Sequence, residues 1–206
     1  MKEENQIFSS PLSGLKFKGK RNYLQGPDIQ RAALNCLAIA YPASAITDID
    51  IVFHGMARTG LLLLETDNPG TEPIVQLRCK VGGERKKFLL VEDGMPILER
   101  VEYAEEEIVA ATEIQVATAT ATSVSALPYS NIERWVSMVK ALHLAVYPDL
   151  VGKWLYVRGK FDQYQDVYDP PVQHQVVVQA NFNSKLTRTS VLVDQQRLGD
   201  IFFSLE

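Results

Sequence analysis

An apolar helical segment at residues 28–41, DIQRAALNCLAIAY, constrains the fold more than any other part of the sequence. From Leu34 onward nearly every side chain is apolar, so a helix here has almost no polar face. Such a helix is normally buried on most sides. Pro27 suits the first turn of a helix, and Pro42 disfavours helical geometry in the residue before it. We therefore expect a helix that other elements cover nearly all round.

A second segment, NIERWVSMVKALHLAVY at residues 131–147, is the counterpart of the first. It opens with Ser130-x-x-Glu133, the capping-box pattern. Its apolar residues recur at helical spacing, which predicts a helix with a buried stripe. Both segments end in Tyr-Pro and are followed by a strand-like run that ends in Gly. This order suggests that one unit is used twice.

Further matches between the halves are separated by 102 to 106 residues. The pairs are Ile29 with Ile132, Tyr41-Pro42 with Tyr147-Pro148, Gly55 with Gly159, Gln76 with Gln179, and Leu90 with Leu192. Near-constant spacing over several elements indicates an internal repeat, with a slightly longer second helix. The alternative is an unrelated α+β protein that has one helix per hundred residues by chance.

Runs with a period of two predict the strands of an α+β fold. Gly82-Gly83 is expected to close a hairpin, the acidic stretch at 96–107 is expected to be a connecting helix, and residues 169–171 are expected to turn. The predicted strands are residues 15–23, 47–54, 61–65, 74–81, 87–91, 114–126, 153–158, 175–181 and 187–193, and the end of the chain, 201–203, is expected to pack on the sheet.

The overall charge and the apolar runs exclude several classes of protein. The 206 residues carry a net charge of −4, and no basic stripe offsets it, which argues against a nucleic-acid partner. No run approaches the roughly 18–20 apolar residues that span a bilayer, and no secretory signal is visible. The cysteines, Cys36 and Cys79, have no metal-ligand spacing and are typical of a reducing compartment. We expect a cytoplasmic protein without a membrane partner.

A long apolar helix, preceded by one strand and followed by four, resembles the hotdog fold, in which an antiparallel sheet wraps around a central helix. The resemblance implies a polar tail at 1–14, a first hotdog-like repeat at 15–94, an acidic linker at 95–113 and a second repeat at 114–206. Hotdog units normally pair, so two in one chain imply an internal pseudo-dimer, with further homo-oligomers open.

The resemblance also implies a function, because hotdog proteins typically act on acyl thioesters of coenzyme A or acyl carrier protein. Hotdog dehydratases need a carboxylate on the helix and a His-Arg-aromatic-Pro opening. Gln30 and Arg31 stand near the place of that carboxylate, and the opening is absent. If the chain is an enzyme, the resemblance favours a thioester hydrolase over a dehydratase.

The resemblance also implies candidate site residues at the helix starts, because hotdog thioesterases often place an acid or Gln/Asn there. Free N–H groups at that place can polarise a thioester carbonyl, and the side chain can direct water. On this interpretation Asp28 and Gln25 are catalytic candidates, and Gly26 and Asn131 are ligand-binding candidates. For Asp28 the structural alternative is stronger, because Asp is common near helix N-termini.

Histidines add one more candidate. His54 lies late in a predicted strand and is included as a catalytic residue, although alternation turns it away from the helix and Arg158 stands in the matching place. His143 is expected to be a core or edge residue, and His174 to face solvent from a loop. The three histidines share no spacing, so neither a metal nor a cofactor is expected.

Three functions remain open. The first is an acyl-thioester binding protein, as a thioesterase or a non-hydrolytic binder, with acyl-CoA or acyl carrier protein as partner. The second is a catalytically inactive hotdog-like scaffold or subunit, which the missing carboxylate and the unpaired His54 favour. The third is an unrelated α+β binding module, in which the apparent repeat has no structural meaning.

Overall fold

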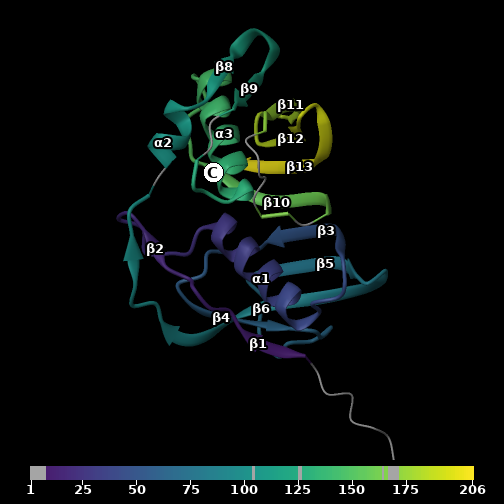
Figure 1. The fold of residues 1–206 in the computed structure, drawn as a ribbon. Helices are drawn as coiled ribbons and strands as arrows, with labels where there is room; N and C mark the ends of the chain where they lie inside the picture. The colour runs from purple at the N-terminus through teal and green to yellow at the C-terminus, as the bar shows by residue number, and fades with distance from the viewer. Residues whose placement is uncertain (1–7, 104, 125–126, 164, 167–171) are drawn as a thin grey trace, which may run out of the picture. The chain divides into compact units, whose positions relative to one another are not determined.

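The computed structural model describes residues 8–103, 105–124, 127–163, 165–166 and 172–206. The chain divides into two compact units, Met1–Val101 and Glu102–Glu206, here called the first and second units (Figure 1). The predicted tail up to residue 7, the end of the predicted strand at 125–126 and the predicted turn at 169–171 lie outside the described residues.

The first unit is an antiparallel sheet with one long helix lying across it (Figure 1). In sheet order the strands are β1, β4, β6, β5 and β3, and β2 and β7 form a separate two-stranded parallel ribbon. The elements are β1 (Ser9–Pro11), β2 (Phe17–Lys18), α1 (Gly26–Ala40), β3 (Ile46–Phe53), β4 (Thr59–Leu64), β5 (Val75–Val81), β6 (Glu84–Pro96) and β7 (Arg100–Val101). β1 lies in the segment expected to be a polar tail.

The second unit has the same composition of layers, with the helix α3 against an antiparallel sheet (Figure 1). Its strands run β10, β13, β12, β11, β9 and β8 across the sheet. The elements are α2 (Glu105–Ala110), β8 (Glu113–Gln115), the 3₁₀ turn η1 (Val116–Thr118), β9 (Thr120–Ser123), α3 (Asn131–Val146), β10 (Trp154–Gln163), β11 (His174–Phe182), β12 (Leu186–Val193) and β13 (Gln196–Leu205).

The first unit buries one stripe of α1, whereas the second buries every residue of α3 from Asn131 to Val139, which is more than the predicted stripe. On α1 the fully buried apolar residues are Ile29, Ala33, Leu34 and Leu37, and on α3 they include Met138, Val139 and Leu142. Burying one such large apolar side chain contributes about 1.5–3 kcal/mol. The expected α+β class, with a helix packed on an antiparallel sheet in each half, is therefore confirmed.

One face of α1 differs from the prediction. The sequence suggested a helix buried nearly all round, but Asn35 is exposed and Ile39 is 80% exposed. The physical reason is that the sheet covers only the stripe of the helix that faces it. The apolar composition of residues 34–40 therefore does not by itself mean complete burial.

The two long helices end in the same way. The capping residues Tyr41 and Tyr147 have nearly equal backbone angles, φ −128° and ψ 62° against φ −124° and ψ 57°. Each donates its N–H to the carbonyl four residues earlier, Leu37 at 2.8 Å and His143 at 2.9 Å. The second helix is the longer, 16 residues against 15, as predicted.

Several strand predictions need correction. Only Phe17–Lys18 of the predicted strand at 15–23 is extended, and β6 continues to Pro96, past the expected end at 91. The run at 114–126 is two strands, because η1 interrupts it and Ala119 adopts a left-handed conformation with φ 48°. The connecting helix, α2, begins at Glu105, later than the acidic run suggested.

The sheets of the two units differ in strand order. In the second unit the strand beside β10 is the last one, β13, and consecutive strands from β11 to β13 are neighbours. In the first unit the strand beside β3 is β5. The last strand of that sheet, β6, lies between β5 and β4. Gln76 and Gln179, matched by sequence spacing, consequently lie on strands with different places in their sheets.

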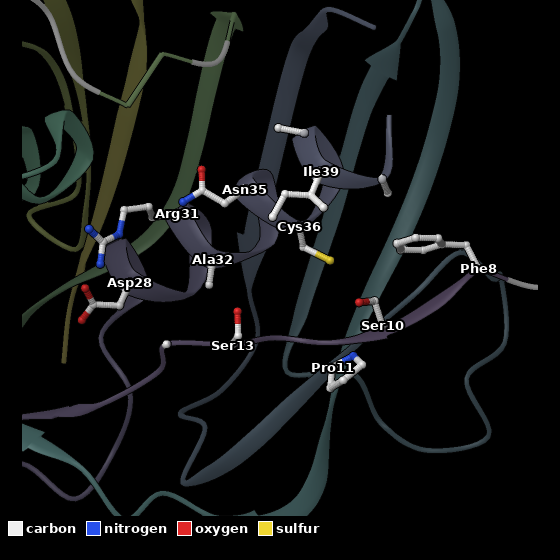
Figure 2. Close-up of a pocket in the computed structure, with 13 residues that line it drawn as sticks. Phe8, Ser10, Pro11, Ser13, Asp28, Arg31, Ala32, Asn35, Cys36 and Ile39 are labelled. Carbon is white, nitrogen blue, oxygen red and sulfur yellow. The ribbon is translucent and has the colours of Figure 1, made fainter. Parts of the chain in front are cut away.

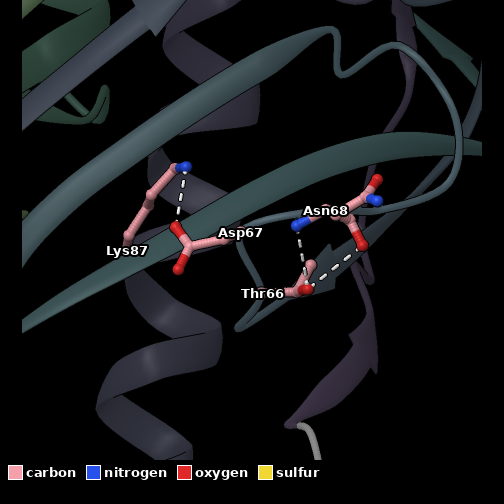
Figure 3. Close-up of polar contacts among 4 residues, drawn as sticks. All are labelled: Thr66, Asp67, Asn68 and Lys87. Carbon is pink, nitrogen blue, oxygen red and sulfur yellow. Dashed lines mark hydrogen bonds and ion pairs between the residues drawn. The ribbon is translucent and has the colours of Figure 1, made fainter.

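The connection from β4 to β5 makes this order possible, because it carries the chain past the position of β6. It begins with a local turn in which the Thr66 hydroxyl donates to the Asn68 carbonyl and accepts from the Asn68 N–H, both at 3.2 Å. Lys87 on β6 forms an ion pair with Asp67 at 3.0 Å (Figure 3). The exposed start of the connection is thus fixed to the strand that it passes.

Candidate functional site

A groove of about 540 Å³ runs along the exposed face of α1, between the helix and the segment 8–14 (Figure 2). Both walls belong to the first unit. The lining residues are Phe8, Ser10, Pro11, Ser13, Gly14, Asp28, Arg31, Ala32, Asn35, Cys36, Ala38, Ile39 and Ala40. Asp28, in the first turn of the helix, is one of these lining residues.

The helix presents its lining residues in two rows. Positions four apart lie on one helix face, and Arg31, Asn35 and Ile39 form one row in this way. Asp28, Ala32, Cys36 and Ala40 form the other row. Polar and charged groups gather at the end near Asp28, and Ile39 and Phe8 lie toward the other end (Figure 2). The groove is therefore polar at the helix start and mainly apolar along the rest of its length.

A nearly buried ion pair lies at the polar end of the groove. Lys18 Nζ is 2.9 Å from Asp28 Oδ1, and the two side chains are 11% and 9% exposed. Asp28 occupies the first turn of α1, where the helix dipole also favours negative charge. The carboxylate of Asp28 is therefore held in place by β2 and by the helix, beside a cavity that a ligand can enter.

Gln25 and Gly26 adjoin this end but do not line the groove. Gln25 caps α1 with extended backbone angles and without a side-chain hydrogen bond to the helix. Its Oε1 accepts a hydrogen bond from Arg21 at 3.1 Å, while its Nε2 is buried without a hydrogen-bond partner in the described part of the chain. Gly26 is the first residue of the helix, and Pro27 offers no N–H, so the early backbone donors are those of Gly26 and Asp28.

His54 and Asn131 lie elsewhere. His54 follows β3, is exposed, and is absent from the lining of the groove. Asn131 starts α3 in the second unit, where its N–H donates to the Asp166 carbonyl at 2.8 Å and its Nδ2 to the Gln165 carbonyl at 3.1 Å. Of the five residues predicted from sequence, only Asp28 lines this cavity, and Asn131 holds a loop to its helix.

The second unit buries polar groups that the sequence had not placed together. Trp135 Nε1 donates to His174 Nδ1 at 3.0 Å, so the His174 proton is on Nε2. His174 is 2% exposed and begins β11, which corrects its expected place in a solvent-facing loop. Burial, with the nearby Arg134 guanidinium, lowers the pKa of His174 to about 4.

His143 is a second buried histidine, as expected for a core residue. Its ring stacks on Trp154 with centroids 4.6 Å apart, and Nδ1 lies 2.7 Å from the Val139 carbonyl, to which it donates. Nε2 has no hydrogen-bond partner among the described residues. Burial lowers the pKa of His143 to about 4, so the ring is neutral at physiological pH.

Other kinds of site were sought over the described ranges. No group of three or more His, Cys, Asp or Glu side chains there is arranged to hold a metal ion. No described helix has the length and apolar character needed to cross a membrane. Cys36 and Cys79 are both free thiols, and burial raises the pKa of Cys79 to about 11.

Comparison with known proteins identifies the fold. No protein-family model matches the chain, and no curated protein matches its sequence. A tesB protein of Mycobacterium avium subsp. paratuberculosis has a TM-score of 0.53 at 11% identity, over 97% of this chain and 92% of that one. An acyl-ACP thioesterase from Bacteroides thetaiotaomicron has a TM-score of 0.51 at 10% identity, over 100% of both chains.

A third solved structure is the dehydratase domain of PpsC from Mycobacterium tuberculosis in complex with C12:1-CoA. It has a TM-score of 0.52 at 12% identity and covers 97% of this chain and 93% of that one. These similar structures are hotdog-fold proteins, so the resemblance drawn from the sequence is confirmed at the level of the fold.

Sequence reasoning missed most of the groove. Its outer wall is formed by residues 8–14, which are far from α1 in sequence and carry no motif. A signal was present on the helix itself, because Arg31 and Asn35 interrupt an apolar segment at a spacing of four residues. A polar row in an otherwise apolar helix indicates a face that the sheet leaves open.

Proposed function

We propose that the chain is a hotdog protein that binds acyl thioesters of coenzyme A or acyl carrier protein. The observation that supports this most directly is the groove along α1, which begins at the buried carboxylate of Asp28 and becomes apolar toward Ile39. A thioester is polar at one end and apolar along its chain, so its polarity matches that of the groove.

Hydrolysis is the reaction that this geometry supports best. In the proposed step Asp28 takes a proton from a water molecule as the water oxygen attacks the thioester carbonyl carbon. The C–S bond then breaks, and the proton passes from Asp28 to the departing thiolate, which leaves a carboxylic acid and a thiol. Backbone N–H groups at the start of α1 would stabilise the negative charge on the carbonyl oxygen.

Binding without hydrolysis is a second candidate, and two observations favour it. Asp28 is already paired with Lys18, and a carboxylate in an ion pair is a weaker base. His54, the other catalytic candidate, is exposed and outside the groove lining. On this alternative the chain would hold an acyl thioester, or serve as a subunit, without turning it over.

The test measures binding and hydrolysis separately. Titration calorimetry with acyl-CoA and acyl carrier protein substrates of increasing chain length measures affinity, and a thiol-release assay measures turnover. If Asp28 is the base, Asp28→Asn should abolish turnover with little change in affinity. Asp67→Asn, an acid in an exposed ion pair, is the matched control and should leave both unchanged.

Because Asp28→Asn removes the carboxylate that pairs with Lys18, the double variant Lys18→Met with Asp28→Asn is made as well and checked for folding. Equal turnover in the wild type and in either folded variant would rule out the role of Asp28. Absence of binding to every acyl thioester tested would contradict the proposed function as a whole. Binding without turnover in the wild type would select the second candidate.

A further inference from the structure

Arg31 is a cation in the groove without a counter-ion of its own. Within the described part of the chain its guanidinium forms no hydrogen bond or ion pair, and it lies on the groove lining (Figure 2). The nearby Asp28 charge is balanced by Lys18 at 2.9 Å. The polar end of the cavity therefore has Arg31 as a cation on its lining beside an acid, Asp28, that is already paired.

The side chains become less polar along the helix row that begins with Arg31. One turn further on is Asn35, an amide, and one more turn further is Ile39, which is 80% exposed. With a rise of 1.5 Å per residue, Arg31 and Ile39 are about 12 Å apart along the axis. From the opposite wall Ser13 adds a hydroxyl near the polar end, and Phe8 adds a ring near the apolar end (Figure 2).

We propose that this groove binds a fatty carboxylate, with its head group on Arg31 and its chain extended toward Ile39 and Phe8. The inference rests on the proposed function, because a fatty carboxylate is the acyl product that thioester hydrolysis would release. The guanidinium can donate two parallel hydrogen bonds to a carboxylate. The Ser13 hydroxyl supplies a further donor within the same lining.

The charge distribution favours an anionic head group over the alternatives. A neutral alcohol of equal chain length would fill the apolar part but leave the Arg31 charge unused. A cationic head group would be repelled by Arg31, since Asp28 is already paired. The chain length should be medium, because the apolar part of the groove ends near Ile39 and Phe8.

The experiment compares head groups on one chain. Decanoate, decanol and decyltrimethylammonium are titrated into the full-length protein by calorimetry, below their micelle concentrations. The wild type should bind decanoate at least about tenfold more tightly than decanol, as expected for a charge-assisted pair. Equal affinity for decanoate and decanol in the wild type would overturn the proposal without any variant.

The variants then locate the head group. Arg31→Met should remove the preference for decanoate and leave decanol affinity within about twofold, while Arg31→Lys should keep part of the preference. Arg85→Met is the matched control, because Arg85 is an exposed arginine on β6 that does not line the groove. An unchanged decanoate affinity in Arg31→Met, or an equal loss in Arg85→Met, would contradict the assignment.

The same preparations are titrated with decanoyl-CoA, which separates the two proposals. Arg31-dependent binding of decanoate without any binding of acyl thioesters would reject the proposed function and leave the carboxylate site standing. Binding and turnover of decanoyl-CoA with no preference for decanoate would reject the carboxylate site alone.

Discussion

The two units share the apolar stripe and the end of their long helix but differ at its start. Tyr41 and Tyr147 cap their helices with nearly the same backbone angles. At the other end, Ser130 accepts a hydrogen bond from the Glu133 N–H, whereas Gln25 forms no such cap. The first unit instead stabilises its helix start through the ion pair of Asp28.

The interiors differ as well. The second unit buries two histidines, His143 and His174, and two threonines on β12 whose hydroxyls lack a hydrogen-bond partner in the described ranges. Both units also bury polar side chains at or near the helix start, namely Lys18, Asp28 and Gln30 in the first and Ser130, Asn131, Glu133 and Arg134 in the second. Folding requires the apolar stripe in both units, while the positions of polar groups are free to differ with function.

The first prediction compares the nearly buried ion pair at the start of α1 with an exposed ion pair of the same unit. Asp28→Asn removes the charged partner of Lys18 in a nearly buried ion pair, so the free energy of unfolding should fall by about 3–4 kcal/mol. Urea denaturation measures the change. Asp67→Asn, in the exposed pair of Figure 3, should cost less than about 1 kcal/mol. Equal costs would show that burial does not distinguish the pairs.

A second prediction tests whether a buried leucine of α1 and one of α3 contribute equally to the free energy of unfolding. Leu37→Ala and Leu142→Ala each remove a fully buried side chain, and each should lower the free energy of unfolding by about 3 kcal/mol. The exposed counterparts, Ile39→Ala and Leu144→Ala, should change it by less than about 0.5 kcal/mol. A much smaller cost at one buried leucine than at the other would break the equivalence of the two helices.

A third prediction uses the histidines, which are buried in the second unit only. The pKa of His143 is about 4 when folded and near 6.5 when unfolded, so the unfolded chain binds more protons between these values. The stabilisation is complete above pH 6.5 and is lost as the pH falls toward 4. Between pH 7.5 and 5 the loss from His143 should be about 2 kcal/mol.

His143→Phe keeps a stacked ring and cannot be protonated, so its free energy of unfolding should fall by about 2 kcal/mol less than that of the wild type over the same pH range. His54→Asn, at an exposed position of the first unit, should follow the wild type. Parallel pH profiles for His143→Phe and the wild type would refute the prediction.

The smallest expected effect concerns the helix caps. Ser130→Ala removes an acceptor of the Glu133 N–H and should cost about 1 kcal/mol. Gln25→Ala should cost less through the cap, because the Gln25 side chain does not bond to the helix. Thermal denaturation of both variants compares them. A larger cost for Gln25→Ala would indicate that its contact with Arg21 matters more than a helix cap.

Local patterns predicted the helices and the hairpin because these depend on neighbouring residues. Pro27 and Pro42 bracket α1, and Gly82 and Gly83 both adopt positive φ in the turn between β5 and β6. The order of strands was not predictable in this way. An alternating run determines which side chains face inward, but not which strand lies beside it.

The candidate site was predictable only where it coincides with a helix terminus. Asp28 was identified because hotdog thioesterases often carry an acid at the helix start, and Asp28 stands at that place in the sequence. Lys18 and the wall at residues 8–14 reach the site through the tertiary fold, so no spacing in the sequence connects them with α1. His54 was included for its chemistry alone, although alternation already turned it away from the helix, and the structure places it in an exposed position.

The first unit places β5 beside β3, whereas the second unit places its last strand, β13, beside β10. This difference has a consequence for protein engineering. Consider a chimera in which the chain from residue 65 to the end of the first unit is replaced by the corresponding stretch of the second. Its last two strands would then be connected for the strand order of the second sheet and not for that of the first. An exchange confined to the Tyr-Pro terminus keeps the same backbone geometry in both units. Recombination after β4 should therefore give chains whose strands cannot pair in the native order.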